Sequence, residues 1–444
     1  MALAKDSTLL EADRAISLVE SVVKKSEAEG VFVSLNNAEE SLSRYSENQI
    51  TQNITRTKFN LTVTSYFGTR SASASTTELD EDAIAQTIRR SQDLARIAPE
   101  DPEWIPLLEP QTYEQRLPAF DLTTAACSPL VRGEIVQRAC HSAAKAGVQA
   151  SGTLSTEASS VAIANSKGLQ AYNRSTEANF SLTIRIENGS SWSERTAWSI
   201  TQLPTELITE QLIDRAFAAR NPREINPGIY PVIFDGAAFS NLLGWIIWNL
   251  DARAADEGRS FMSRTDGEGN RLGEKIFSPL VQVNRDPAHP LLQSNPFFSD
   301  GLSNNYLEVI KDGTPQVLSY SRYWAQQQGK LPTGYFFPIV MSGSNQNLTD
   351  LIAQTERGIL VSRVWYTNYI NPKTLEITGM TRDGTFWIED GKIAYPIKNF
   401  RFNQKLPEMM RDIDALTTSD RYGNSIVPGV RVKAFNFSSI SDSV

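Results

Sequence analysis

The longest apolar segment of this 444-residue chain covers residues 237–262 and follows a strand-like run at residues 228–235. Its apolar side chains recur three and four positions apart, at Phe239, Leu242, Leu243, Ile246, Leu250 and Ala254. This spacing predicts one helix with an apolar face, which Ile247 widens. The segment holds roughly ten apolar positions before its first charge, about half of what a membrane span needs. We therefore expect a helix that is buried in a large core.

Charge and cysteine content narrow the class of protein. The formal net charge is -8 and no basic cluster with interleaved aromatic residues occurs, so nucleic acid is not an expected partner. The start of the chain has no apolar signal region and no segment predicts a membrane span, so we expect a cytoplasmic protein with no membrane partner. The two cysteines, Cys127 and Cys140, agree with a reducing compartment.

The N-terminal half contains two similar stretches, at about residues 9–98 and 129–220. Each predicts a helix, about four antiparallel strands and a second helix. In the first stretch the helices are expected at residues 9–29, where Gly30 would end the helix, and at 80–96. The strand-like runs between them lie at residues 31–35, 42–49, 59–64 and 71–76. We therefore expect an internal repeat.

The C-terminal half follows a proline-containing linker and is dominated by strand-like runs. These runs lie at residues 274–284, 305–311, 358–366, 385–395 and 430–437. Short helices are expected at 348–354, with Asn347 as the cap, and at 407–416. The fold class is therefore α+β with two domains, at residues 1–222 and 228–444. The first carries the repeat, and the second is a mostly antiparallel, barrel-like sheet around one buried helix.

With the strand before it, the apolar helix resembles the helix that carries the metal motif of the TldD/PmbA family of metallopeptidases. That motif is His-Glu-x-x-x-His, and the matching positions in this chain are Trp248, Asn249 and Arg253. Four further stretches carry the same resemblance, at residues 43–48, 347–361, 384–400 and 427–432. The likeness extends over most of the chain, and these stretches follow one another in the order and spacing of the family.

The resemblance implies a peptidase scaffold without its metal site. Zinc needs imidazole, thiolate or carboxylate ligands, whereas Trp248 has no such group and Arg253 is a permanent cation. Asn249 cannot act as a general base where the family uses a glutamate. The family's third ligand is a cysteine near the C-terminus, and this chain has no cysteine after Cys140. We therefore expect these positions to be degenerate, with no catalytic residue, metal or cofactor.

Members of the family are of two kinds. TldD-like members keep the zinc motif, and TldE-like members, also called PmbA, lack it. The two kinds pair into a heterodimer that degrades or trims peptides. The resemblance therefore implies a non-catalytic TldE-like subunit, with a TldD-like metallopeptidase as its partner and a peptide as the substrate.

Two functions of other classes stay open. One is a homodimeric binding or scaffold protein without a peptidase partner. The other is an enzyme that uses carboxylate chemistry, with Asp251, Asp256 and Glu257 as the candidate groups. On a continuous helix Asn249 and Arg253 would lie one turn apart, and Arg253 is expected to pair with Asp256 or Glu257.

The remaining candidate groups give weaker signals. The two histidines, His141 and His289, have no second histidine at a metal-ligand spacing, so each is expected to be structural or solvated. Aromatic side chains are dense at residues 320–324 and 365–366. They are typical of a peptide groove, and equally of a core or a subunit interface.

Overall fold

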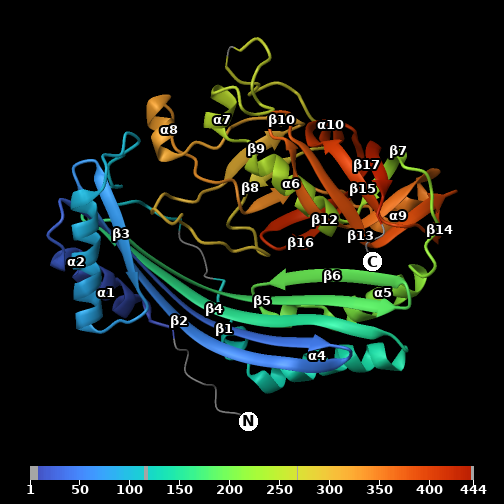
Figure 1. Ribbon diagram of the computed structural model, residues 1–444, viewed down its shortest axis with the longest axis horizontal. Coiled ribbons are helices and arrows are strands. Elements are labelled where there is room, and N and C mark those ends of the chain that lie inside the picture. The colour runs from blue at the N-terminus through green and yellow to red at the C-terminus, as the bar shows by residue number, and fades with distance from the viewer. Residues whose placement is uncertain (1–8, 115–118, 268, 442–444) are drawn as a thin grey trace.

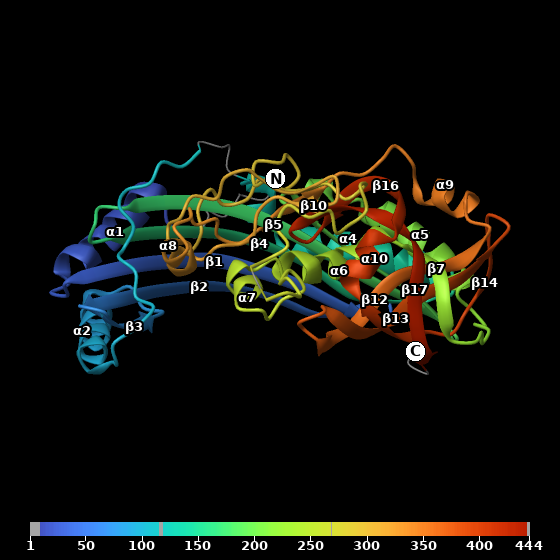
Figure 2. The same cartoon turned by 90° about the horizontal axis from the view of Figure 1, so that it is seen from above.

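The computed structural model describes residues 9–114, 119–267 and 269–441. Figure 1 shows a long, curved antiparallel sheet from the N-terminal half, with the C-terminal half above one end of it. Seen from above, the strands continue past the C-terminal half toward the helices α1 (Ala12–Lys25) and α2 (Glu81–Ile97) (Figure 2). This arrangement confirms the predicted α+β class.

The curved sheet is built from two units, each with the order helix, three strands, helix. The first unit adds to α1 and α2 the strands β1 (Gly30–Ser46), β2 (Gln49–Phe67) and β3 (Arg70–Thr76). The second consists of α4 (Pro129–Lys145), β4 (Gln149–Asn165), β5 (Gln170–Ile186), β6 (Gly189–Ala197) and α5 (Thr205–Ala218). Between the elements lie two short helices, α3 (Leu122–Ala125) and η1 (Ile200–Gln202).

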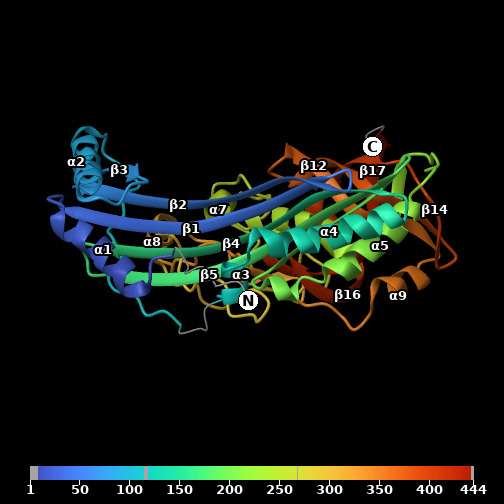
Figure 3. The same cartoon turned by 90° about the horizontal axis from the view of Figure 1, so that it is seen from below.

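The two units meet at the centre of the sheet. The strand order is β3-β2-β1-β4-β5-β6, and β1 pairs antiparallel with β4 from Phe32–Asn165 to Tyr45–Gly152. Figure 3 shows α4 and α5 on the underside of the sheet, so one face is covered by helices and the opposite face is turned toward the C-terminal half. Apolar residues of β4 and β5 alternate into the helix-covered core, as expected for a sheet with one buried face.

The expectation of four strands in each unit was wrong. The run at residues 31–35 and most of the run at 42–49 belong to one strand, β1, which ends at Ser46 before the turn into β2. The strand is continuous because β1 pairs with β2 along its whole length with a single irregularity at Arg44/Tyr45. Gly30 does not end the first helix either; α1 ends at Lys25 and Gly30 opens β1. Polar residues at the centre of β1 hid its continuity from a pattern that depends on alternating apolar side chains.

In residues 228–267 and 269–441, the C-terminal half contains a mixed sheet and five helices. Its strands are β7 (Gly228–Phe234), β8 (Val283–Arg285), β9 (Leu307–Lys311), β10 (Thr314–Pro315), β11 (Ile339–Met341), β12 (Arg357–Asn371), β13 (Glu376–Glu389), β14 (Lys392–Pro396), β15 (Phe400–Lys405), β16 (Ile413–Tyr422) and β17 (Ser425–Ile440). Its helices are α6 (Gly236–Trp248), α7 (Ala252–Asp256), α8 (Arg322–Gln327), α9 (Leu348–Ala353) and α10 (Leu406–Arg411).

Five of these strands form a closed ring of paired strands. In the order β17-β15-β13-β12-β7 each strand pairs with the next, and β7 pairs back with β17. Most pairs are antiparallel, whereas β7–β12 and β11–β17 are parallel. The helix α6 packs on β17 and β12, and its apolar side chains belong to the largest buried cluster of the chain. The barrel-like sheet around a buried helix is therefore confirmed.

Two expected elements of this half differ from the structure. Only Val283–Arg285 forms a strand within the expected run at 274–284, because the backbone of Ile276 and Phe277 instead donates to Gly313 in a turn. The helix expected at 407–416 ends at Arg411, and β16 starts at Ile413.

The division into domains at residues 1–222 and 228–444 stays a prediction. No helix in the described part of the chain is long and apolar enough to cross a membrane.

Candidate functional site

The helix that was expected to be continuous over residues 237–262 is interrupted at the motif positions. The helix α6 ends at Trp248, and α7 starts at Ala252. Between them the backbone forms a bridge to Ser319, which donates to the oxygen of Leu250 (2.7 Å) and accepts from the nitrogen of Ala252 (3.1 Å). Because these groups pair with another segment, the helical ladder cannot continue through them. Asn249 and Arg253 are therefore not one turn apart on a single helix.

Trp248 points out of the core at the end of α6. Its side chain is 61% exposed and stacks on Tyr335, with the ring centroids 5.6 Å apart and the ring planes at 10°. Both rings border a cavity between the two halves of the chain. The position where the family's first metal ligand would stand therefore presents a flat aromatic surface, which has no lone pair for a metal.

Asn249 is held by two neighbouring aromatic residues. Its Nδ2 donates to the carbonyl oxygen of Trp245 (2.8 Å), and its Oδ1 accepts from the hydroxyl of Tyr369 (2.9 Å). The rings of Trp245 and Tyr369 are perpendicular, with centroids 4.6 Å apart. The amide thus caps the end of α6 and ties it to β12, which is a structural role.

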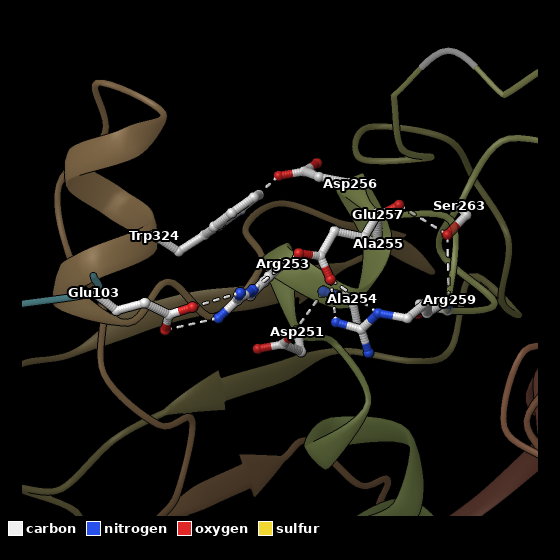
Figure 4. A network of polar contacts seen from close by, with 11 residues as sticks. Glu103, Asp251, Arg253, Ala254, Ala255, Asp256, Glu257, Arg259, Ser263 and Trp324 are labelled. Carbon is white, nitrogen blue, oxygen red and sulfur yellow. Dashed lines mark hydrogen bonds and ion pairs between the residues drawn. The ribbon is translucent and has the colours of Figure 1, made fainter. Parts of the chain in front are cut away.

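Arg253 turns toward the long connection between the two units of the sheet (Figure 4). Its guanidinium donates to both carboxylate oxygens of Glu103, at 2.7 and 3.0 Å, and its Nε donates to Glu257 at 3.0 Å. The hydrogen bond to Glu103, followed by that to Glu257, raises the pKa of Arg253 above its usual value. The cation also faces the rings of Trp324 (5.4 Å) and Tyr323 (5.8 Å).

The carboxylates proposed for an alternative chemistry also have structural partners (Figure 4). Asp251 caps α7 by accepting from the backbone nitrogen of Ala254 at 2.7 Å. Asp256 accepts from Trp324 Nε1 and from Asn270 Nδ2, both at 2.8 Å, so it does not pair with Arg253. These contacts give both aspartates a structural role, because each carboxylate holds a neighbouring segment in place.

Glu257 is the expected partner of Arg253 and also pairs with Arg259. The hydrogen bond from Arg259, together with that from Arg253, lowers the pKa of this carboxyl below its usual value. A carboxylate that two cations hold in the ionised state is a poor general base or acid near neutral pH.

Metal ligands do not converge on the motif. His141 is exposed on α4, whereas His289 lies in a loop, where its Nδ1 accepts from the backbone of Leu291 (3.3 Å). In residues 9–114, 119–267 and 269–441, no three His, Cys, Asp or Glu side chains are placed to hold one metal ion. The residues at the motif positions therefore do not fit the zinc that the family resemblance implies.

A cavity of about 920 Å³ lies between the uncovered face of the curved sheet and the C-terminal half. The sheet contributes polar side chains from β1, β4 and β5, and the other wall is formed by residues around 292–304, 335–338 and 421–424. Its size falls within the range of small-molecule and peptide sites. Trp248 borders this space, whereas Asn249 and Arg253 do not.

Most of the cavity wall could not be identified from the amino-acid sequence. Tyr335 and the glutamates of the sheet belong to no recognisable motif, because strands far apart in the chain bring them together. The two aromatic stretches predicted to line a groove, at residues 320–324 and 365–366, have different surroundings in the structure. Tyr320 is buried and Trp324 binds Asp256, whereas Trp365 packs against the guanidinium of Arg363 at 4.2 Å. Neither stretch borders the cavity.

Two family models match the chain. Residues 126–220 match the central domain, and residues 227–439 match the C-terminal domain, of PmbA/TldA metallopeptidases. Among curated proteins, "Metalloprotease PmbA" of Escherichia coli O157:H7 is 27% identical over 396 residues, which are 84% of this chain and 85% of that protein. The "Metalloprotease PmbA homolog" of Haemophilus influenzae is 22% identical over 388 residues, 83% of each chain.

A solved structure has the same fold. TldE from Thermococcus kodakarensis superposes with a TM-score of 0.86 and 18% sequence identity, covering 95% of this chain and all of that one. The resemblance read from residues 347–361, 384–400 and 427–432 agrees with these matches, because all three stretches lie within the matched C-terminal domain. Because the two family models together match most of the chain and a curated PmbA relative matches 84% of it, this protein belongs to the PmbA/TldD family.

Proposed function

We propose that this chain is a non-catalytic, TldE-like subunit, which pairs with a metal-bearing TldD-like protein and helps to enclose the peptide that the partner cleaves. The observation that carries the proposal is the fate of the three motif positions. Trp248 stacks on Tyr335, Asn249 binds Trp245 and Tyr369, and Arg253 binds Glu103 and Glu257. The three side chains therefore point toward different parts of the structure and do not converge on a common point.

The cavity supports a role in holding a peptide. It lies at the end of α6 where the family carries its metal motif, and it joins the face of the sheet to the C-terminal half. A polar sheet face opposite aromatic side chains offers both hydrogen-bonding groups and apolar surface to an extended peptide. In this chain the residues would bind and orient the substrate, and the catalytic metal and the general base would come from the partner.

Restoring the motif side chains alone should not restore catalysis. The variant Trp248→His, Asn249→Glu, Arg253→His is expected to show no metal-dependent peptidase activity, because the helix break keeps the three positions from converging and no cysteine follows Cys140. Cleavage of a casein-derived peptide mixture, followed by mass spectrometry with and without added zinc, is the measurement.

The folded state of this variant is checked by circular dichroism and by its thermal midpoint. A matched control, Arg253→Gln alone, removes the charge and the pairing with Glu103 while adding no ligand. Zinc-dependent cleavage by the folded triple variant would show that the site is complete without a partner, and the proposal would fall.

A further inference from the structure

The floor of the large cavity carries a row of charged side chains in direct register. Across four neighbouring strands, Arg56 of β2 lies opposite Glu40 of β1, Glu40 opposite Glu157 of β4, and Glu157 opposite Glu177 of β5. Directly opposite residues in antiparallel strands point to the same face. Three glutamates therefore stand side by side on the face that borders the cavity.

The two outer glutamates are neutralised and the central one is not. Glu40 accepts from Arg56 Nε (2.7 Å) and Lys58 Nζ (2.6 Å), and Glu177 lies 3.3 Å from Arg421 Nη2. In the part of the chain that the structure describes, the Glu157 carboxylate has neither a hydrogen bond nor an ion pair. Like charges directly opposite each other destabilise a sheet, so a cation beside Glu157 would offset repulsion from both sides.

The cation of Arg421 cannot swing across to fill this place. Its side chain is only 9% exposed, and its other nitrogens donate to the carbonyl oxygens of Leu291 (2.6 Å) and Gly423 (2.9 Å). Burial raises the pKa of Glu177 despite Arg421, and the neighbouring Glu157 and Glu194 act in the same direction. Glu157 and Glu177 are therefore close enough for their carboxylates to repel each other even with Arg421 in place.

An independent feature of the same cavity suits the apolar parts of an organic ligand. The exposed Trp248 and Tyr335 present parallel stacked rings to the cavity, and Phe298 meets Tyr335 edge-on at 6.2 Å. Aromatic faces of this kind pack on the apolar parts of a peptide, whatever charge the peptide carries. A metal ion is the less suitable occupant, because the described acidic side chains are not placed to coordinate one.

We propose that this cavity binds an extended peptide that carries an arginine or lysine side chain, with the cation beside Glu157 and the chain against Trp248 and Tyr335. The inference rests on the proposed function, in which the cavity holds the peptide, and adds the class of peptide. It makes Glu157 a specificity-determining residue that acts in binding and takes no part in bond cleavage.

The test compares two synthetic eight-residue peptides that are identical except for one central residue, arginine or its neutral isostere citrulline. Both peptides have blocked ends and a fluorescent label, and binding to the full chain is followed by fluorescence anisotropy. We expect the arginine peptide to bind at least about tenfold tighter, as for a hydrogen bond to a charged group. Glu157→Gln should bring the two affinities to within about threefold of each other.

Two further variants distinguish the contribution of the Glu157 charge to binding from that of the aromatic contacts. Trp248→Ala should weaken both peptides alike, because it removes ring contacts and leaves Glu157 in place. Glu134→Gln removes an exposed glutamate from α4, on the helix-covered side of the sheet, and should leave both affinities unchanged.

Equal binding of the two peptides, no binding of either, or an arginine preference that survives Glu157→Gln would each overturn the inference. The proposed function is tested separately, by measuring peptidase activity after mixing the chain with a TldD-like protein. If the arginine peptide binds more tightly but the mixture is inactive, the binding site is supported and the subunit role is rejected. If the mixture is active but the two peptides bind equally, the subunit role is supported and the binding site is rejected.

Discussion

Alanine at position 152 is expected to lower the free energy of unfolding by about 3 kcal/mol or more, one of the largest effects of any single methyl group in this chain. Gly152 lies in β4, where Tyr45 of β1 reaches over it to donate to the carbonyl oxygen of Ser181 at 2.9 Å. A Cβ atom there would collide with that backbone oxygen and lie 2.7 Å from the Tyr45 hydroxyl. Urea unfolding followed by circular dichroism measures the loss.

The collision is with backbone, so it cannot be relieved by a side-chain rotation. Tyr45→Phe alone should cost about 1 kcal/mol for its hydrogen bond and should not rescue Gly152→Ala. Gly133→Ala is the matched control: it lies inside α4, where a Cβ atom meets only Ile50 Cδ1 at 3.7 Å, and it should leave stability unchanged or raise it by up to about 1 kcal/mol. A Gly152→Ala protein as stable as the original would refute the close approach of β4 and β5 to Tyr45.

Truncating Phe239 to alanine is the second large effect, with an expected loss of about 3–5 kcal/mol. The ring is 0% exposed in α6 and belongs to the buried cluster between this helix and the mixed sheet. Its removal leaves a cavity that the closely packed neighbours cannot easily fill. Denaturant unfolding monitored by near-ultraviolet circular dichroism reports this loss, because aromatic side chains of the same cluster give the signal.

Trp248 on the same helix provides the contrast. Its side chain is larger but mostly exposed, and its main contact is the stacked ring of Tyr335. Trp248→Ala should therefore cost only about 1 kcal/mol. If Trp248→Ala were as damaging as Phe239→Ala, the indole would have to belong to the core, and its assignment to the cavity wall would be wrong.

The periodic parts of the sequence were predicted well because their signals are local. The hairpin at residues 385–395 forms between β13 and β14, around a turn in which Asp390 and Gly391 both have positive φ. Asn347 caps α9 through a reciprocal pair of hydrogen bonds with Asp350. Alternation and capping depend on residues within a few positions, so one sequence suffices to read them.

The break after Trp248 could not be read from apolar spacing. Leu250 keeps the helical spacing and is fully buried, yet its carbonyl oxygen accepts from Ser319, nearly seventy residues later. A tertiary contact therefore overrides the local preference. The one local signal was Asp251, a residue type that favours helix starts and does cap α7.

The partners of the motif positions and the row of glutamates were also beyond a local reading. Glu103 lies in a connection without regular structure, 150 residues before Arg253. Glu40, Glu157 and Glu177 become neighbours only through the register of three long strands. Such sites are defined by pairing across the fold, and spacing along the chain carries little information about them.

The central claim is that this chain lacks its own metal site and works with a metal-bearing partner. Its most direct test is zinc content by mass spectrometry together with peptidase activity, measured on the purified chain alone and after addition of a TldD-like protein. We predict no bound zinc and no cleavage by the chain alone, with cleavage by the mixture exceeding that of the TldD-like protein by itself. Stoichiometric zinc or peptide cleavage with the chain alone would contradict the account built on Trp248, Asn249 and Arg253.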